Sequence, residues 1–316
     1  MTVLGPVAPD ELGLTHIHEH LAIKLHAPDP SLGWIDDWDL AIEELAYFRQ
    51  AGGQTIVDVT PIGARLNRGN LKHGDALRHV SQTAGVHIVA GTSFMYEPMF
   101  PDQHRECNAE EMAAIMVSEL TEGMQGTGAR AGIIGEVGSG GGEDFTPLEM
   151  RLFQASALAH QTTGAAVSTH TFAGRLGLRQ VRLLESSGVD PSRIVIGHLD
   201  SGESMAVDWP YHIEIARTGA CVAYDLVGRE GDAGKLFAFA SDENRVRGVL
   251  ELVAAGFIRQ VLLSEDVCRK FRLHRYGGTG YDHLLRTFVP MLLEAGLSKS
   301  EVSTILVENP RRVLAM

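Results

Sequence analysis

Short apolar runs alternate with longer amphipathic segments along nearly the whole chain. The short runs, rich in β-branched residues, predict eight strands at residues 14–21, 54–60, 87–93, 131–137, 166–171, 194–200, 220–226 and 261–267. Segments with apolar residues three or four positions apart predict helices at residues 39–50, 108–122, 147–163, 178–187, 209–218, 243–255, 281–294 and 299–307. Glycines suited to a left-handed helix end precede the next strand at Gly52, Gly53, Gly85, Gly164, Gly188, Gly219 and Gly256.

The alternation of strand and helix predicts a parallel sheet. Eight repeats favour an α/β fold of the closed (β/α)8 TIM barrel type over an open sheet, and 316 residues suit one such barrel with long loops. No Ser/Pro-rich linker interrupts the pattern, so we expect one domain over residues 1–316. In such barrels the chemistry lies at the carboxyl ends of the strands.

Composition narrows the class of protein. Acidic residues outnumber basic ones by 40 to 27, a net charge of −13, which argues against a nucleic-acid partner because such surfaces are basic. No run approaches the ~18 apolar residues that a membrane helix needs, and residues 1–13 lack the features of a signal peptide. The three cysteines are widely spaced, which argues against disulfides and a thiolate metal site. We therefore expect a cytoplasmic protein with no membrane partner.

Six polar residues fall at or near the carboxyl ends of five predicted strands. They are His18 and His20 on the first strand, Glu136 on the fourth, His170 on the fifth, His198 on the sixth and Asp266 on the eighth. Residues two apart in a strand point to the same face, so His18 and His20 should both face the barrel interior. The same parity places His16 one layer deeper on that face and turns Glu19 to the other.

Imidazoles and carboxylates in this number suit two divalent metal ions. A lone His-x-His pair or strand-end carboxylate is weak evidence, since either is often a buried core residue or a solvated charge. Six such residues on one rim, in strand order, are hard to attribute to chance. The ligand types favour Zn²⁺, with Mn²⁺, Co²⁺ and Fe²⁺ as the other choices. A glutamate can bridge two ions about 3.5–4 Å apart, and the ions lower the pKa of a bridging water toward ~7.

At these residues the chain resembles the phosphotriesterase-like family of the amidohydrolase superfamily. The resemblance runs from Gly13 to Pro310 and is clearest at residues 132–138, 168–171, 195–198, 263–266 and 277–282. It implies that His18, His20 and Asp266 bind a buried metal and that a second, more exposed metal is bound by His170 and His198. It also implies that Asp266 is catalytic and accepts the proton of a metal-bridging hydroxide.

The fourth predicted strand departs from many members of that family. They bridge the metals with a carboxylated lysine, whereas this chain has Glu136 there and no lysine in residues 131–137. The chain therefore resembles the glutamate-bridged subgroup called phosphotriesterase homology proteins. Lactonase members carry a substrate-contacting tyrosine and arginine where this chain has Met95 and Leu226. The neighbouring Tyr96 and the nearby Arg229 are candidate substitutes for them.

Further substrate contacts are expected in the segment after the eighth predicted strand. Arg269, Arg272 and Arg275 gather there and could hold an anionic substrate over the metals. The alternative is a solvated loop face with no role in binding.

These observations predict a binuclear metal-dependent hydrolase that cleaves an ester, lactone or phosphoester bond of a small molecule. Two alternatives stay open: an N-acyl amide hydrolase, and a member of the family that binds a small molecule without turnover. The resemblance makes a homodimer plausible.

Overall fold

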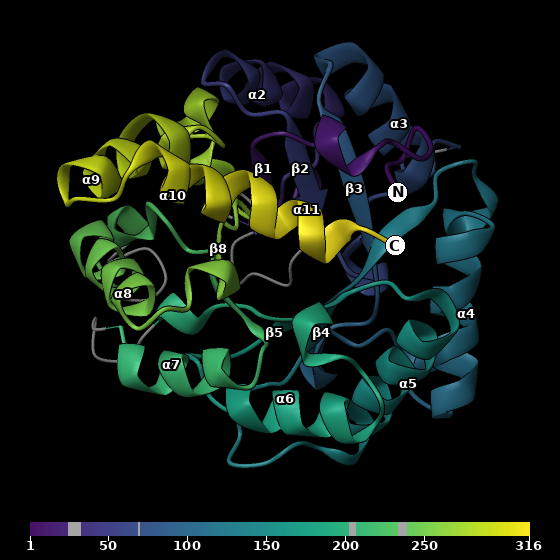
Figure 1. Cartoon of the computed structure of the whole chain (residues 1–316). Coiled ribbons are helices and arrows are strands. Elements are labelled where there is room, and N and C mark those ends of the chain that lie inside the picture. Colours follow the sequence, from purple (N-terminus) through teal and green to yellow (C-terminus); the bar gives the residue numbers. More distant parts are fainter. Residues whose placement is uncertain (25–32, 69, 202–206, 233–238) are drawn as a thin grey trace.

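A computed structural model describes residues 1–24, 33–68, 70–201, 207–232 and 239–316. Its strands form one parallel eight-stranded sheet in chain order, and β8 comes back into contact with β1 (Figure 1). The strands are β1 (Thr15–Glu19), β2 (Thr55–Asp58), β3 (His87–Thr92), β4 (Ala131–Gly138), β5 (Val167–His170), β6 (Ile194–Ile196), β7 (Cys221–Tyr224) and β8 (Val261–Leu263). The predicted (β/α)8 TIM barrel is therefore confirmed.

Helices surround this sheet and connect its strands (Figure 1). They are α2 (Trp38–Gln50), α3 (His73–Ala84), α4 (Ala109–Thr121), α5 (Pro147–Thr163), α6 (Gly177–Ser186), α7 (Trp209–Arg217), α8 (Asp242–Ala254), α9 (Val289–Glu294), α10 (Lys299–Ser303) and α11 (Asn309–Leu314). Two π-helical turns, Leu284–Phe288 and Thr304–Glu308, precede α9 and α11. In the described part of the chain, no helix is long and apolar enough to cross a membrane.

The main difference from the expected elements is α3, which the periodicity did not predict. Its buried residues do recur at helical spacing, but Leu77 and Val80 are the only large apolar side chains among them, and the segment is polar on average. Its end was foreseen, because Gly85 takes the left-handed conformation at φ 65°. All strands except β4 are shorter than predicted, since several polar residues at their carboxyl ends lie just outside the ladder.

The barrel has two apolar layers. Inside the sheet, Ile17, Val57, Val89 and Leu262 belong to one buried cluster. Outside it, a larger cluster fills the space between the strands and the helices. Alternate side chains along the strands thus lie in the inner and the outer apolar layer, as expected for a parallel barrel.

The amino-terminal end of the barrel is closed by α11. Val313 and Leu314 join the interior cluster together with Leu12, which precedes β1. The Arg193 guanidinium donates to the Val313 carbonyl at 3.0 Å and so holds the end of this helix in place. The C-terminus directly follows α11 (Figure 1).

The seam between β1 and β8 is closed largely by one side chain. The Glu19 carboxylate accepts hydrogen bonds from the Ser264 hydroxyl at 2.8 Å, the Glu265 amide at 2.9 Å and the Val267 amide at 2.8 Å. Glu19 therefore points away from the barrel axis, as expected, and joins the first strand to the segment that carries Asp266.

Candidate metal centre

Three of the predicted ligands meet at the carboxyl ends of β1 and β8. The Asp266 Oδ1 atom lies 3.2 Å from His20 Nε2 and 3.9 Å from His18 Nε2. All three residues are buried, and their ligand atoms lie within 4.8 Å of one another. This group could hold one metal ion.

A second group forms next to the first, on β4, β5 and the segment after β6. The Glu136 Oε1 atom lies 2.7 Å from His170 Nδ1 and 3.0 Å from His198 Nε2. Glu136 and His198 are buried, whereas His170 is partly exposed. This group could hold a second ion nearer the solvent.

Glu136 lies between the two groups. Its Oε1 atom is 3.5 Å from His18 Nε2, and its Oε2 atom is 4.0 Å from His20 Nε2. One carboxylate therefore faces two imidazoles of the first group and two of the second. That is the placement a bridging ligand needs.

Asp225 was not singled out in the sequence, yet it supports both groups. Its Oδ1 atom lies 2.9 Å from His198 Nδ1, and its Oδ2 atom lies 3.2 Å from His18 Nδ1. A carboxylate on the second ring nitrogen orients an imidazole ligand and fixes its tautomer. The available signal was its position directly after β7, at the same rim as the other polar strand-end residues.

Asp225 is itself held by a buried chain of polar groups. Its amide donates to Asp200 Oδ1 at 3.2 Å, and Asp200 Oδ2 accepts from Arg245 Nε at 2.6 Å. Arg245 and Asp200 are both fully buried. Partners arranged in this way keep the two imidazoles in one orientation.

The alternation expected for the first strand is wrong at His16. The His16 ring packs edge-on against Phe48 of α2 at 4.8 Å, on the outer side of the sheet, while Ile17 enters the interior cluster. The pairing of β1 with β2 shifts register between His16 and Glu19. This irregularity lets His18 turn toward the barrel axis although His16 does not.

Two of the candidate ligands have left-handed backbone conformations. His198 has φ 58° and Asp266 has φ 46°, a region that residues other than glycine rarely adopt. Each such residue costs on the order of 1–3 kcal/mol, and such residues cluster at functional sites. Both conformations turn a side chain at a strand end toward the barrel axis.

Charge and burial at the site favour a bound cation. Burial opposes a charge on His18, but the Glu136 and Asp225 carboxylates outweigh it and raise the pKa of His18 to about 9. Burial also opposes ionisation of Glu136, yet the His170 and His18 imidazoles hold the pKa of Glu136 well below its usual range. Buried carboxylates that stay ionised attract a cation, and protons compete with a metal for the imidazole nitrogens.

Unpaired polar atoms show that the site fits metal ions. His18 Nε2 and Glu136 Oε2 are buried and have no hydrogen-bond partner among the described residues. Buried polar atoms are nearly always satisfied, so each requires a partner that the protein does not supply. Ligand atoms about 2.0–2.2 Å from one ion lie about 3–4 Å apart. The distances of Asp266 Oδ1 from His20 Nε2 and His18 Nε2, 3.2 and 3.9 Å, and of Glu136 Oε1 from His198 Nε2, 3.0 Å, fall in that range.

Two of the predicted substrate contacts reach this centre. The Tyr96 ring stacks on the His170 imidazole with 5.3 Å between centroids and 23° between planes. Arg229 donates from Nη1 to Asp266 Oδ2 at 2.6 Å. Burial opposes ionisation of Asp266, but hydrogen bonding from His20 and the Arg229 charge lower its pKa to about 2.

The remaining predicted contacts have different surroundings. Arg272 is buried and donates to the Val227 carbonyl at 3.1 Å and to the Gly228 carbonyl, so it supports the loop after β7. Arg275 is half exposed and forms an ion pair with Glu43 of α2. The structure therefore does not bring either to the metal centre. In Arg269, by contrast, two buried donor atoms have no partner among the described residues.

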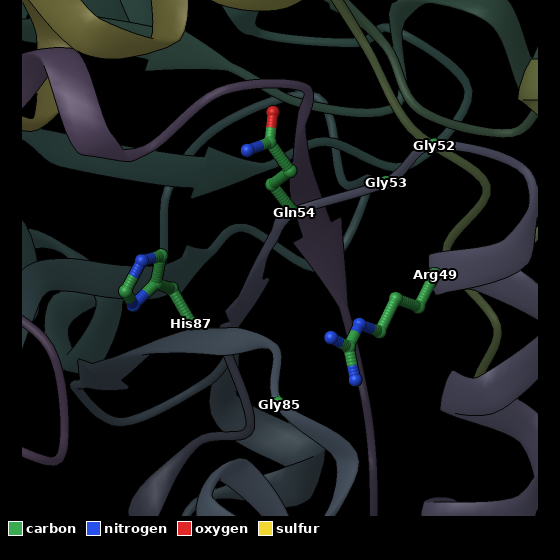
Figure 2. A pocket seen from close by; sticks show the side chains of 6 residues that line it. All are labelled: Arg49, Gly52, Gly53, Gln54, Gly85 and His87. Carbon is green, nitrogen blue, oxygen red and sulfur yellow. The ribbon is translucent and has the colours of Figure 1, made fainter.

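A cavity of about 360 Å³ lies at the opposite end of the barrel. It is lined by Arg49, Gly52, Gly53, Gln54, Gly85 and His87, which come from the amino ends of β2 and β3 and the end of α2 (Figure 2). That end of a TIM barrel normally serves stability. The position of this cavity therefore separates it from the candidate metal centre.

The whole chain matches one family of known proteins. The model of the "Phosphotriesterase family" matches residues 1–314. The chain is 33% identical over 302 residues to the phosphotriesterase homology protein of Escherichia coli (strain K12), a match that covers 95% of this chain and 97% of that protein. It is 32% identical to the N-acetyltaurine hydrolase of Danio rerio, covering 99% of this chain and 97% of the relative.

A solved structure agrees with these relatives. The structure of a resiniferatoxin-binding protein from Rhodobacter sphaeroides is similar to this one with a TM-score of 0.90 and 31% identity, covering 99% of this chain and 94% of that chain. Sequence and fold therefore match over the same extent, and the resemblance seen at the strand ends is confirmed. This chain belongs to the phosphotriesterase family.

Proposed function

We propose that this protein is a two-metal hydrolase that cleaves an ester, lactone, phosphoester or amide bond of a small molecule. The observation that carries the proposal is the Glu136 carboxylate, which faces both ligand groups at once. His18, His20 and Asp266 would hold one ion, His170 and His198 the other, and Glu136 both. When bound, the two ions supply Lewis acidity and lower the pKa of the attacking water.

The remaining steps belong to the protein's own side chains. Asp266 is ionised at neutral pH, and its Oδ1 atom faces the ligand groups, so it can take the proton of the attacking water. Arg229 holds the other carboxylate oxygen and fixes the orientation of Asp266. Tyr96 covers the His170 ring and forms part of the wall against which the substrate lies.

An amide, an ester, a lactone and a phosphoester are all compatible with this site. The relatives named as N-acetyltaurine hydrolases favour the amide as the first bond to test. Fold alone does not decide between these bonds, because one barrel can serve many substrates.

The test is hydrolysis before and after metal replacement. We expect chelation to abolish turnover of at least one compound in a panel of N-acetyltaurine, an aryl acetate, a γ-lactone and an aryl phosphotriester. Added Zn²⁺, or Mn²⁺, Co²⁺ or Fe²⁺, should restore it. Turnover unchanged in a metal-free sample would contradict the proposal. Elemental analysis should give two ions per chain for wild type and fewer for Glu136→Gln.

A binding protein without turnover is the second candidate, because the similar Rhodobacter sphaeroides structure is of a resiniferatoxin-binding protein. Saturable ligand binding by the fully metal-loaded protein, with no turnover across the panel, would favour this candidate. A homodimer and a cytoplasmic location are further proposals, to be tested by light scattering and by cell fractionation.

A further inference from the structure

The loop after β8 is rich in basic side chains, and most of them are neutralised. The Lys270 ammonium lies 2.6 Å from Asp36 Oδ1. Arg272 donates to backbone carbonyls, and Arg275 pairs with an acidic residue on the surface of α2. These three cations are therefore already committed to partners in the protein.

Arg269 differs from its neighbours. Its Nε and Nη1 atoms are buried and have no hydrogen-bond partner among the described residues. Leaving buried donors of a charged group unpaired costs more than leaving neutral ones unpaired, so such atoms call for an acceptor. The Nε–H and Nη1–H bonds point to different sides of the guanidinium, so one anion from outside the chain could accept from the Nη1 side but not from both donors.

The position of Arg269 relates it to the metal centre. It lies three residues after Asp266 in the same segment. Its guanidinium also lies close enough to the Tyr96 phenol for its charge to act on that group. Arg269 and Glu136 thus influence the same phenol with opposite charges.

The backbone keeps Tyr96 in this place. A Cβ atom added at Gly138, the last residue of β4, would come within 2.8 Å of the Tyr96 amide nitrogen. A glycine at this point therefore allows the tyrosine to pack closely over the end of β4. The ring then stacks on the His170 imidazole.

We propose that Arg269 is a specificity-determining residue that binds an anionic group of the substrate. Carboxylate, sulfonate and phosphate share the required chemistry, because each offers two oxygens to the guanidinium fork. The inference rests on the proposed hydrolase function and narrows its substrate class to small acyl compounds with an anionic end. In a protein of net charge −13, a local cation is needed to attract such a substrate.

The test compares two acetamides of similar length, one of which carries an anionic end group. N-acetyl-3-aminopropanoate carries a carboxylate, and N-butylacetamide is close in length but neutral. We expect Arg269→Gln to lower kcat/KM for the anionic amide by about 10- to 100-fold and to leave the neutral amide within about twofold. Arg269→Lys should retain part of the preference, because lysine keeps the charge but loses the fork.

Lys270→Gln is the matched control, since it removes one positive charge from the adjacent position, where the side chain pairs with Asp36. It should leave the anionic preference unchanged. An equal loss for both substrates in Arg269→Gln, or an equal loss of preference in Lys270→Gln, would overturn the assignment.

A binding measurement separates this inference from the hydrolase proposal. Calorimetric titration of metal-free wild type and Arg269→Gln with N-acetyl-3-aminopropanoate needs no turnover. At least tenfold weaker binding to the variant would support the anion site even if no compound is hydrolysed. Equal binding to both proteins would contradict it even if the metal-loaded enzyme is active.

Discussion

The amino-terminal end of the barrel is filled by apolar side chains from α11 and the segment before β1, whereas the carboxyl end gathers imidazoles and carboxylates. At the first end Leu314 and Val313 pack inside the sheet. The Arg193 guanidinium donates a hydrogen bond to the Val313 carbonyl there. At the second end His198 and Asp266 have left-handed backbones, and buried polar atoms lack partners among the described residues. One end stabilises the barrel, and the other retains conformations that cost stability but suit chemistry.

The largest expected effect comes from the carboxyl end. Asp266→Asn should lower kcat by about 10²- to 10⁴-fold, because the amide cannot take the proton of the attacking water. Asparagine tolerates a left-handed backbone, so the fold should survive. Steady-state kinetics on the best panel substrate, with a thermal scan of the metal-free protein, checks both parts. Activity close to wild type would remove Asp266 from its proposed role.

The matching substitution at the amino-terminal end tests stability instead of activity. Leu314→Ala should lower the free energy of unfolding by about 2–5 kcal/mol, because it leaves a cavity in the interior cluster. Urea unfolding measures the loss, and kcat at a temperature where the variant is folded should stay within about twofold of wild type. A large loss of kcat in the folded variant would mean that the two ends are not independent.

Asp225→Asn sharpens the comparison, because Asp225 contacts candidate metal ligands and is not among the predicted ligands itself. Asp225 contacts one imidazole from each ligand group, so metal affinity should fall by about 10- to 100-fold at both sites. Competition with a chromophoric chelator measures this change. Thr60→Val is the matched control, because among the described candidate ligands the Thr60 hydroxyl contacts one imidazole alone, that of His20 at 3.0 Å. An equal loss at both sites in that control would argue against the special position of Asp225.

The smallest expected effect is on the pH dependence of stability, and it comes from a residue at neither end of the barrel. Burial lowers the pKa of His212 to about 3, and its Nδ1 atom lies 2.8 Å from the Tyr224 hydroxyl. The unfolded chain binds a proton near pH 6.5 and the folded chain does not, so stability present above pH 6.5 falls as the pH drops. We expect a loss of about 1 kcal/mol from this group at pH 6 relative to pH 8.

Metal-free protein is used for this measurement, because protons also displace metal from the candidate centre. Unfolding in urea at the two pH values should show a weaker pH dependence for His212→Gln than for wild type. The same dependence in both proteins would show that the imidazole is not held neutral in the fold.

Much of this architecture is predictable because barrel strands are short apolar runs with polar residues at one end. The helix α3 was missed although its buried residues recur at helical spacing, because only Leu77 and Val80 among them are large apolar side chains. The residues of both ligand groups were foreseen from their strand-end positions. The turn of His16 away from the interior depends on a register shift, which residue spacing cannot reveal.

The arginines show a second limit of prediction from the sequence. Four of them lie near strand ends in the sequence, but the partners of Arg272 and Arg275 come from elements far away along the chain. Arg275 meets Glu43 of α2, and Arg272 meets the loop after β7, so neither is available at the centre. Only tertiary contacts separate these from Arg269, whose buried Nε and Nη1 donors lack a partner among the described residues.

The hydrogen bonds of Glu19 have a consequence for the order of events during synthesis. Glu19 joins residues up to 248 positions later in the chain, and His18 and His20 meet Asp266 across the same seam. The group formed by these three residues cannot assemble until β8 and the segment after it have been synthesised and have left the ribosomal exit tunnel. Contacts so distant in sequence form late in folding. Metal uptake at that group would therefore report that the barrel has closed.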